Sequence, residues 1–221
     1  MLKRLFSYFI PVNIYKRNSS VSKSLEVTWA NGQLVLDSQS TNYSYGSLQR
    51  ILRKGLRSIG FDEVVKMDHI LVLGVAGGSV VKTLVDEVNY KGKITGVEID
   101  HEIINVANSY FQLDKIKNLY IVIDDAFEFV LKTKEKYDLI IIDVFQDADM
   151  PGFLFERFFA NRLGFLLNKK GYILFNTMTL NGNHDSRNEQ YISGFDPSEF
   201  AVKTIPRVEQ HNELIVIQKL G

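Results

Sequence analysis

Runs of aliphatic residues, each followed by a helical pattern, predict an α/β fold from residue 68 onward. The first run, residues 70–73, holds four aliphatic residues, as in a strand that is buried on both faces of a parallel sheet. A loop of small residues, 74–78, follows it. Beyond the loop, apolar residues recur at the spacing of one helical face: Val80, Val81, Leu84, Val85 and Val88. Strand, glycine-rich turn and helix form the geometry in which a nucleotide-like ligand meets the backbone N–H groups of a helix N-terminus.

The same alternation continues to the end of the chain. It predicts further parallel strands at residues 93–97, 119–123, 137–142 and 172–176. It predicts helices after Asp100, which we expect to be the N-cap, and at residues 126–132 and 153–167. Residues 179–188 are polar and predict a loop. The last two apolar runs, 201–205 and 213–218, predict an antiparallel hairpin at the sheet edge.

A small module is predicted before the sheet. Two β-rich runs, residues 25–29 and 33–36, flank Asn31-Gly32, a pair that favours the positive φ angles of a tight hairpin turn. A helix is predicted from residue 47 to 59, with Gly60 at its end. We therefore divide the chain into a segment, hairpin and helix module (1–67) and an α/β domain (68–221).

Composition narrows the class of protein. The chain has 221 residues, no cysteine and a net charge of zero. Disulfide and thiolate chemistry are therefore excluded, and no global charge favours nucleic acid. No apolar run is long enough to span a bilayer, so we expect a cytoplasmic protein with no membrane partner. The first eleven residues combine two basic residues with an apolar stretch, which indicates a docked segment, with a signal peptide or membrane foot as the alternative.

The charge is unevenly spread. Residues 1–60 hold nine basic and two acidic residues, so the remainder is net negative. Four of the basic residues share one face of the predicted helix: Arg50, Arg53, Lys54 and Arg57. This face is either simply solvated or complementary to an anionic partner or a second subunit.

Acidic residues stand where successive strands end. Glu98, Asp125 and Asp143 each follow an aliphatic run, which places their carboxylates at the carboxyl edge of one parallel sheet, where ligands bind in open α/β folds. Glu98 lies twenty positions after Gly78, the spacing at which an acid meets ribose hydroxyls in such folds. These residues predict a nucleoside site, although each could also be only a helix cap. The four histidines show no metal-ligand spacing, so no metal site is expected.

Several motifs resemble one family. The chain looks like the class I AdoMet-dependent methyltransferase fold and, more narrowly, is similar to the spermidine synthase (polyamine aminopropyltransferase) branch of that superfamily. The motifs that carry the resemblance are residues 34–37, 72–78, 97–100, 125–129 and 137–143. It implies a Rossmann-like, seven-stranded, mostly parallel sheet with the antiparallel hairpin, preceded by the small N-terminal module. It also implies a homodimer that acts on a small molecule.

The resemblance also implies roles for individual residues. Glu98 would hold the ribose hydroxyls of an AdoMet-type ligand, Asp125 would accept from the adenine amino group, and Asp143 would hold and deprotonate the nucleophile. The expected cofactor is S-adenosyl-L-methionine or its decarboxylated form. The expected cofactor-binding residues are Gly74, Ala76, Gly77, Gly78, Glu98, Ile99, Asp125 and Ala126. Asp143 and Asp147 are the catalytic candidates, and Tyr45 and Asp149 the substrate-binding candidates.

One departure from the family pattern decides the leading hypothesis. The family's glycine-rich loop carries an aspartate that binds the aminopropyl amine of decarboxylated AdoMet, and Gly77 stands at that position here. Without that carboxylate, selection for the decarboxylated donor loses its attractive element. We therefore expect an AdoMet-dependent methyltransferase on a small molecule. The alternatives are a polyamine aminopropyltransferase and a non-catalytic nucleoside-binding protein; an NAD-dependent oxidoreductase is disfavoured because it gives Asp125 and Asp143 no task.

Overall fold

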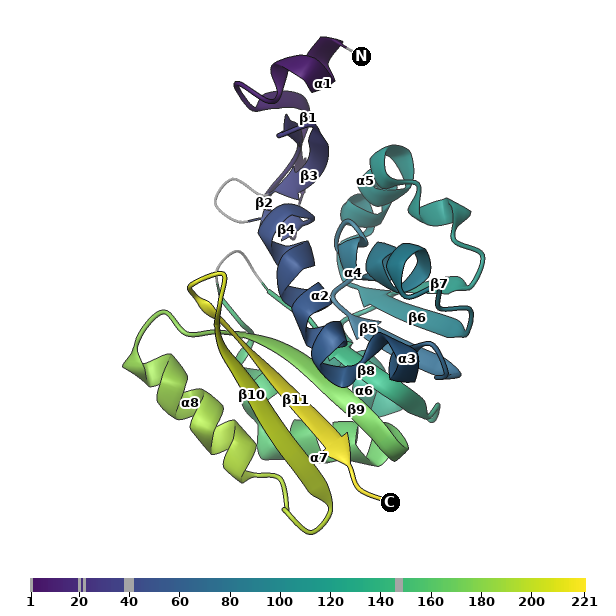
Figure 1. The fold of residues 1–221 in the computed structure, drawn as a ribbon, viewed down its shortest axis with the longest axis vertical. Helices are drawn as coiled ribbons and strands as arrows, with labels where there is room; N and C mark the ends of the chain where they lie inside the picture. The colour runs from purple at the N-terminus through teal and green to yellow at the C-terminus, as the bar shows by residue number, and fades with distance from the viewer. Residues whose placement is uncertain (1, 20, 22, 38–41, 146–148) are drawn as a thin grey trace.

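A computed structural model describes residues 2–19, 21, 23–37, 42–145 and 149–221. Within these residues the strands form two sheets, a small one near the N-terminus and a large one that makes up the body (Figure 1). The small sheet has the strand order β1-β2-β3-β4. The elements up to residue 64 are α1 (Leu2–Phe6), β1 (Val12–Ser19), β2 (Lys23–Ala30), β3 (Gln33–Asp37), β4 (Asn42–Ser44), α2 (Gly46–Ile59) and α3 (Phe61–Val64).

The large sheet confirms the predicted fold class. Over the described part of the chain it has seven strands in the order β10-β11-β9-β8-β5-β6-β7. Strands β9, β8, β5, β6 and β7 are parallel, whereas β10 and β11 are antiparallel, with β10 at the edge. The strands are β5 (His69–Leu73), β6 (Lys93–Glu98), β7 (Leu119–Ile123), β8 (Tyr137–Ile142), β9 (Leu167–Met178), β10 (Phe200–Val208) and β11 (Asn212–Lys219).

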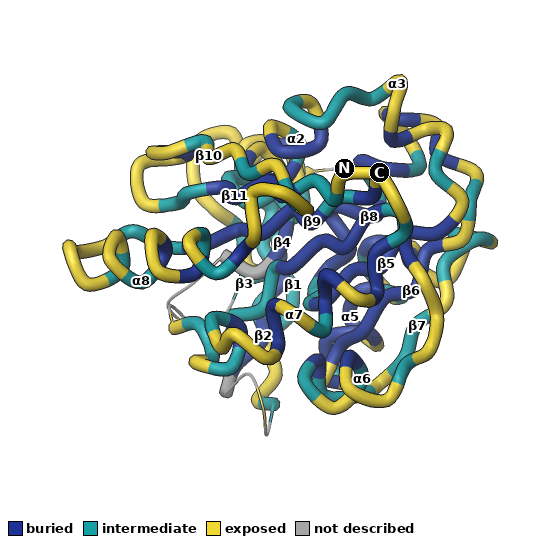
Figure 2. Tube along the Cα trace, turned by 90° about the horizontal axis from the view of Figure 1, so that it is seen from below, coloured by how far each residue is buried: buried dark blue, intermediate teal, exposed yellow. Residues whose placement is uncertain are grey.

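Helices cover both faces of this sheet. Because successive residues of a strand point to opposite faces, Ile70 and Val72 belong to one apolar cluster and Leu71 and Leu73 to the other. The first cluster includes α2, α3 and α4, and the second includes α6, α7 and α8. Figure 2 shows the central strands as the buried layer. The remaining elements are α4 (Ser79–Lys82), η1 (Thr83–Glu87), α5 (His101–Phe111), η2 (Leu113–Lys115), α6 (Ala126–Lys132), η3 (Gly152–Phe155), α7 (Arg157–Leu166) and α8 (Gly182–Ser193).

The predicted hairpin is present and is part of a larger sheet. Ala30 pairs with Gln33 across the turn, and Asn31 and Gly32 have φ angles of 49° and 76°, as the Asn-Gly signal predicts. Strands β1 and β4 extend the hairpin on either side. The inner face of this sheet packs on α5 through an apolar cluster that includes Leu25, Leu36 and Phe111.

The N-terminal segment docks on the hairpin turn. The Ser7 hydroxyl accepts from the Gly32 N–H at 3.0 Å, the Ser7 carbonyl accepts from the Asn31 N–H at 2.9 Å, and Arg4 Nε donates to the Gly32 carbonyl at 3.0 Å. The segment still exposes apolar side chains, with Phe9 at 86%. No helix in the described residues is long and apolar enough to cross a membrane.

Helix α2 lies over the large sheet and contacts β9 and β11. It ends at Ile59 and is followed by Gly60, whose φ of 107° is available to glycine and strained for other residues. Its basic residues are paired within the chain: Arg50 with Glu209 at 2.8 Å and Arg53 with Glu87 at 2.5 Å. At least half of the basic face thus meets acids of the α/β domain. The boundary at residues 67 and 68 stays a prediction.

One local prediction was wrong. Residues 179–188 were predicted to be a loop, but from residue 182 onward they belong to helix α8. The buried side chains of α8 are Asn188 and Tyr191, so it carries no apolar stripe that the sequence pattern could show. The predicted helix after the glycine-rich loop is present, and its second half, η1, is a π-helix. There the Val88 N–H donates to the Thr83 carbonyl, five residues back, and the Thr83 hydroxyl donates to the Ser79 carbonyl, a contact that bends helices.

Candidate functional site

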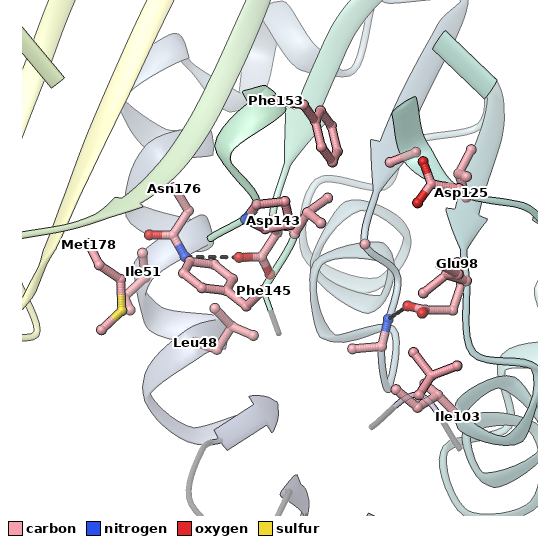
Figure 3. A pocket seen from close by; sticks show the side chains of 18 of the residues that line it. Leu48, Ile51, Glu98, Ile103, Asp125, Asp143, Phe145, Phe153, Asn176 and Met178 are labelled. Carbon is pink, nitrogen blue, oxygen red and sulfur yellow. Dashed lines mark hydrogen bonds between the residues drawn. The ribbon is translucent and has the colours of Figure 1, made fainter. Parts of the chain in front are cut away.

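A cavity of about 440 Å³ opens at the carboxyl ends of the parallel strands (Figure 3). The sheet supplies its floor, and α2 supplies part of one wall. Its described lining residues are Val21, Ser47, Leu48, Ile51, Gly74, Ala76, Val97, Glu98, Ile99, Ile103, Asp124, Asp125, Ala126, Asp143, Val144, Phe145, Pro151, Phe153, Asn176, Met178 and Asn212. The strand-end acids that the sequence singled out therefore meet in one cavity.

Glu98, the last residue of β6, is held by the glycine-rich loop. Its Oε2 accepts from the N–H groups of Val75 at 3.2 Å and Ala76 at 3.0 Å, and its Oε1 accepts from the Asp100 N–H at 3.0 Å. The side chain is 7% exposed, and burial raises the pKa of this carboxyl while the three N–H donors lower it. The loop is thereby tied to the end of the neighbouring strand.

Gly74 allows the ends of β5 and β8 to come together. Its φ is 84°, and a Cβ at this position would overlap the backbone carbonyl oxygen of Asp143. The Asp143 N–H donates in turn to the Leu73 carbonyl at 2.9 Å. This close approach places the Asp143 side chain beside the glycine-rich loop.

Asp143 belongs to a row of three side chains, Asp143, Asn176 and Asn212, that are linked by hydrogen bonds. Its Oδ1 accepts from Asn176 Nδ2 at 2.9 Å, and Asn176 Oδ1 accepts from Asn212 Nδ2 at 3.0 Å. Asn176 is fully buried, so its amide is held by these two bonds. Burial raises the pKa of Asp143 to about 7; the Asn176 bond opposes this, and the charge of Glu98 adds to it. The group therefore changes its protonation near neutral pH.

Asp125 and Asp124 line the opposite part of the cavity, beyond β7. Asp125 is the N-cap of α6, and its Oδ1 accepts from Phe127 N–H at 2.8 Å and Glu128 N–H at 3.3 Å. Asp125 is thus a helix cap and a cavity residue at once. Ala126 is buried beside it. Asp124, which the sequence did not single out as a site residue, follows the same strand and also lines the cavity.

Other predicted site residues lie elsewhere. Gly77 and Gly78 belong to the loop but are not part of the described lining. Tyr45 is also outside it: its ring stacks on Phe111 at 4.6 Å between centroids, and burial raises the pKa of its hydroxyl. Asp149 is exposed and outside the described lining. Asp147 lies outside the described residues. The binding and catalytic roles of all predicted site residues stay predictions.

The apolar side of the cavity was missed by sequence reasoning. Leu48 and Ile51 come from α2, Phe145 follows β8, and Met178 ends β9. Figure 3 shows these four around Asp143 and Asn176, across the cavity from Glu98 and Asp125. Asn176 could have been found by the strand-end rule that found Asp143, because it lies near the carboxyl end of the next parallel strand. Leu48, Ile51 and Asn212 carry no such local signal.

The charge of the cavity has one sign. Its described lining holds four carboxyl groups, those of Glu98, Asp124, Asp125 and Asp143, and no lysine, arginine or histidine. Acids around a partly enclosed space favour cationic ligands. In the described residues, no cluster of three histidine or acidic side chains is placed to hold a metal ion.

Solved structures place the fold in the class I, Rossmann-like methyltransferase group. The crystal structure of a probable spermidine synthase from Corynebacterium glutamicum ATCC 13032 superposes with a TM-score of 0.73 at 17% identity, over 94% of this chain and 79% of that one. The human Methyltransferase-like protein 13 in complex with SAH gives 0.65 at 19% identity, over 80% and 83%. At these identities the likeness shows the fold alone.

The sequence itself shows the family. Residues 53–212 match the Spermine/spermidine synthase domain, and the chain belongs to that family. A polyamine aminopropyltransferase from Vibrio vulnificus (strain CMCP6) is 30% identical over 154 residues, which cover 68% of this chain and 50% of that protein. The chain spans about half or less of the length of the curated relatives it matches. The motif resemblance is confirmed, and the relatives' names favour aminopropyl transfer over the methyl transfer that the sequence suggested first.

Proposed function

We propose that this chain transfers an aminopropyl group from decarboxylated AdoMet to an amine. The observation that carries the proposal is the all-acidic charge of the described cavity lining around Asp143. Decarboxylated AdoMet carries a sulfonium and an ammonium group, whereas AdoMet carries an additional carboxylate. With no basic side chain in the described lining, that carboxylate would meet only like charges, which disfavours AdoMet. The family membership supports the same choice.

The nucleoside half of the donor fits the side of Glu98 and Asp125. Glu98 would accept from the ribose hydroxyls, in bonds to a charged acceptor worth about 1.5–3 kcal/mol. Both capping bonds of Asp125 use Oδ1, so Oδ2 is the atom that would accept from the adenine amino group. Ala126 would lie against the ring. Gly74 and Ala76 line the cavity and keep the loop backbone close to the donor.

Asp143 would serve as the base. An amine has a pKa near 10 and is protonated at neutral pH. Its proton passes to the Asp143 carboxylate, and the nitrogen lone pair attacks the aminopropyl carbon bonded to sulfur. The new N–C bond forms as the C–S bond breaks, and the bonding pair stays on sulfur, which leaves as the neutral thioether 5′-methylthioadenosine. A carboxyl whose pKa is about 7 is better matched to this transfer than one of ordinary pKa.

Methyl transfer from AdoMet is the second candidate, and one contact favours it. A Cβ at Gly77 would lie 2.7 Å from Ser44 Cβ, so the packing leaves no room for the family's loop aspartate. The amine end of decarboxylated AdoMet must then rely on the cavity acids. Methyl transfer would use the same site with AdoMet and leave S-adenosylhomocysteine.

Product analysis tests the proposal. The purified chain is incubated with decarboxylated AdoMet or AdoMet and a panel of primary amines, and products are identified by mass spectrometry. We expect 5′-methylthioadenosine and an aminopropylated amine with the first donor. Asp143→Asn should slow product formation by about 10²–10⁴-fold, whereas Asp114→Asn, which changes an exposed acid outside the described lining, should not. Methylated amine and S-adenosylhomocysteine as the main products would replace the proposal by the second candidate.

A further inference from the structure

The cavity has two sides with different chemistry. Three of its four described carboxyl groups, those of Glu98, Asp124 and Asp125, lie at the carboxyl ends of β6 and β7 on the nucleoside side. The other side consists of Leu48, Ile51, Phe145 and Met178 around Asp143 and Asn176, and we call these four side chains the acceptor wall. Asp143 is the one carboxyl group that the described residues place on this side.

Apart from Asp143, the polar side chains that α2, β9 and β11 contribute to the described lining are uncharged: Ser47, Asn176 and Asn212. Asn176 donates to Asp143 and accepts from Asn212, so its amide is committed to the chain of hydrogen bonds. Ile51 is 3% exposed and packs in the core, which makes this part of the wall a fixed apolar surface. A second ammonium group of an acceptor would therefore leave water for hydrocarbon. That transfer is unfavourable when no partner compensates the charge.

We propose that the acceptor is a primary amine on an apolar body, alkyl or aryl, instead of a diamine. This inference rests on the proposed function, in which Asp143 binds the reacting ammonium group of the acceptor and takes its proton. It adds that the remainder of the acceptor packs on Leu48, Ile51, Phe145 and Met178 through apolar contact. The family relatives are named for polyamines, so this chain would differ from them in its acceptor while sharing their donor chemistry.

A matched pair of amines tests the inference by binding alone. Pentylamine carries a methyl group where 1,4-diaminobutane carries its second ammonium group. Each is titrated calorimetrically into the chain saturated with 5′-methylthioadenosine, which occupies the nucleoside side. We expect pentylamine to bind about tenfold tighter or more, which corresponds to about 1.4 kcal/mol. Tighter binding of 1,4-diaminobutane, equal binding, or binding of neither amine overturns the inference.

A designed exchange tests the wall itself. Met178→Glu adds a carboxylate to the acceptor wall and should shift the preference toward 1,4-diaminobutane, whereas the matched variant Met178→Gln should not. If Met178→Glu does not fold, the wild-type titration still decides. Transfer is assayed separately with decarboxylated AdoMet and both amines. Tight pentylamine binding without transfer would contradict the proposed function and leave the acceptor preference intact. Transfer to 1,4-diaminobutane alone would support the proposed function and contradict the acceptor preference.

Discussion

Asn176 donates a hydrogen bond from Nδ2 to Oδ1 of Asp143 at 2.9 Å, from the end of one parallel strand to the end of its neighbour. The bond favours the ionised carboxyl and partly offsets the burial that raises its pKa. Asn212 fixes the direction of the amide by donating to Asn176 Oδ1 at 3.0 Å. The chain thus holds an acid poised near neutral pH in a cavity whose described charged groups are all acids.

The first prediction concerns pH. Because Asp143 acts as a base only when ionised, kcat/KM should fall about tenfold per pH unit below about pH 7 and level off above it. Asn176→Leu removes a donor to the ionised form and should move this acid limb upward by about one to two pH units, from the 1.5–3 kcal/mol of a charged hydrogen bond. The pH–rate profile of both proteins measures this. If Asn176→Leu leaves the acid limb of the profile at the same pH, a group other than Asp143 controls the loss of activity at low pH.

Asp143→Asn should separate catalysis from donor binding. The amide has nearly the shape of the carboxyl but cannot take up the ammonium proton, so the rate should fall by about 10²–10⁴-fold. Donor affinity should change little, because the nucleoside side of the cavity is untouched. Single-turnover kinetics and donor titration on the same preparation give both values. An equal loss in binding and rate would assign Asp143 to the donor site.

The same variant should stabilise the fold in alkaline solution. The carboxyl loses its proton near pH 4 when unfolded and near pH 7 when folded, so its ionisation is costlier in the folded state. Its destabilising effect is therefore absent below pH 4, grows as the pH rises, and is complete above pH 7. Asp143→Asn should raise the melting temperature at pH 8 and leave it nearly unchanged at pH 4. A gain at pH 4 of the same size would contradict the linkage.

How much of this site the sequence could reveal follows from where its signals lie. Glu98, Asp125 and Asp143 were found because each stands within two positions of the end of an aliphatic run, a pattern that is local in sequence. The Asn31-Gly32 turn was found for the same reason, since its φ angles are set by the two residues themselves.

The remaining residues depend on tertiary packing. Asn212 reaches Asn176 because β11 returns antiparallel to β9, a register that no local pattern encodes. Leu48 and Ile51 belong to the same apolar face of α2 as the core residue Leu52, and only the docking of α2 over the sheet turns part of that face toward the cavity. Tyr45, a predicted substrate-binding residue, stacks on Phe111 of α5 and is not part of the described cavity lining, a placement that only the tertiary structure shows.

Glu98→Gln should weaken donor binding and loosen the glycine-rich loop. Both oxygens of the carboxylate accept from backbone N–H groups, those of Val75, Ala76 and Asp100. Glutamine replaces one of these oxygens by an NH₂ group, which cannot accept and would point at an N–H donor. We expect the donor Kd to rise by about tenfold or more. Hydrogen exchange of the loop amides should accelerate in parallel. Glu189→Gln, an exposed acid on α8, is the matched control and should change neither quantity.

Gly77 should be replaceable only together with Ser44. A Cβ at Gly77 would lie 2.7 Å from Ser44 Cβ, so Gly77→Ala should cost about 1–3 kcal/mol of unfolding free energy. Ser44→Gly in the same chain should recover part of this loss. A Cβ at Gly182 meets no atom of the described residues within 4 Å, and Gly182→Ala is therefore the control. Denaturant unfolding of the wild type, Gly77→Ala, Ser44→Gly and the double variant measures the coupling between the two positions. Additive losses of unfolding free energy would mean that the two residues do not clash.

Calorimetric titration of the wild-type chain with decarboxylated AdoMet and, in parallel, with AdoMet tests the central claim most directly. The acids of the cavity and the absence of a basic residue from its described lining predict tighter binding of the decarboxylated donor. Tighter binding of AdoMet would contradict aminopropyl transfer and make methyl transfer the function to pursue.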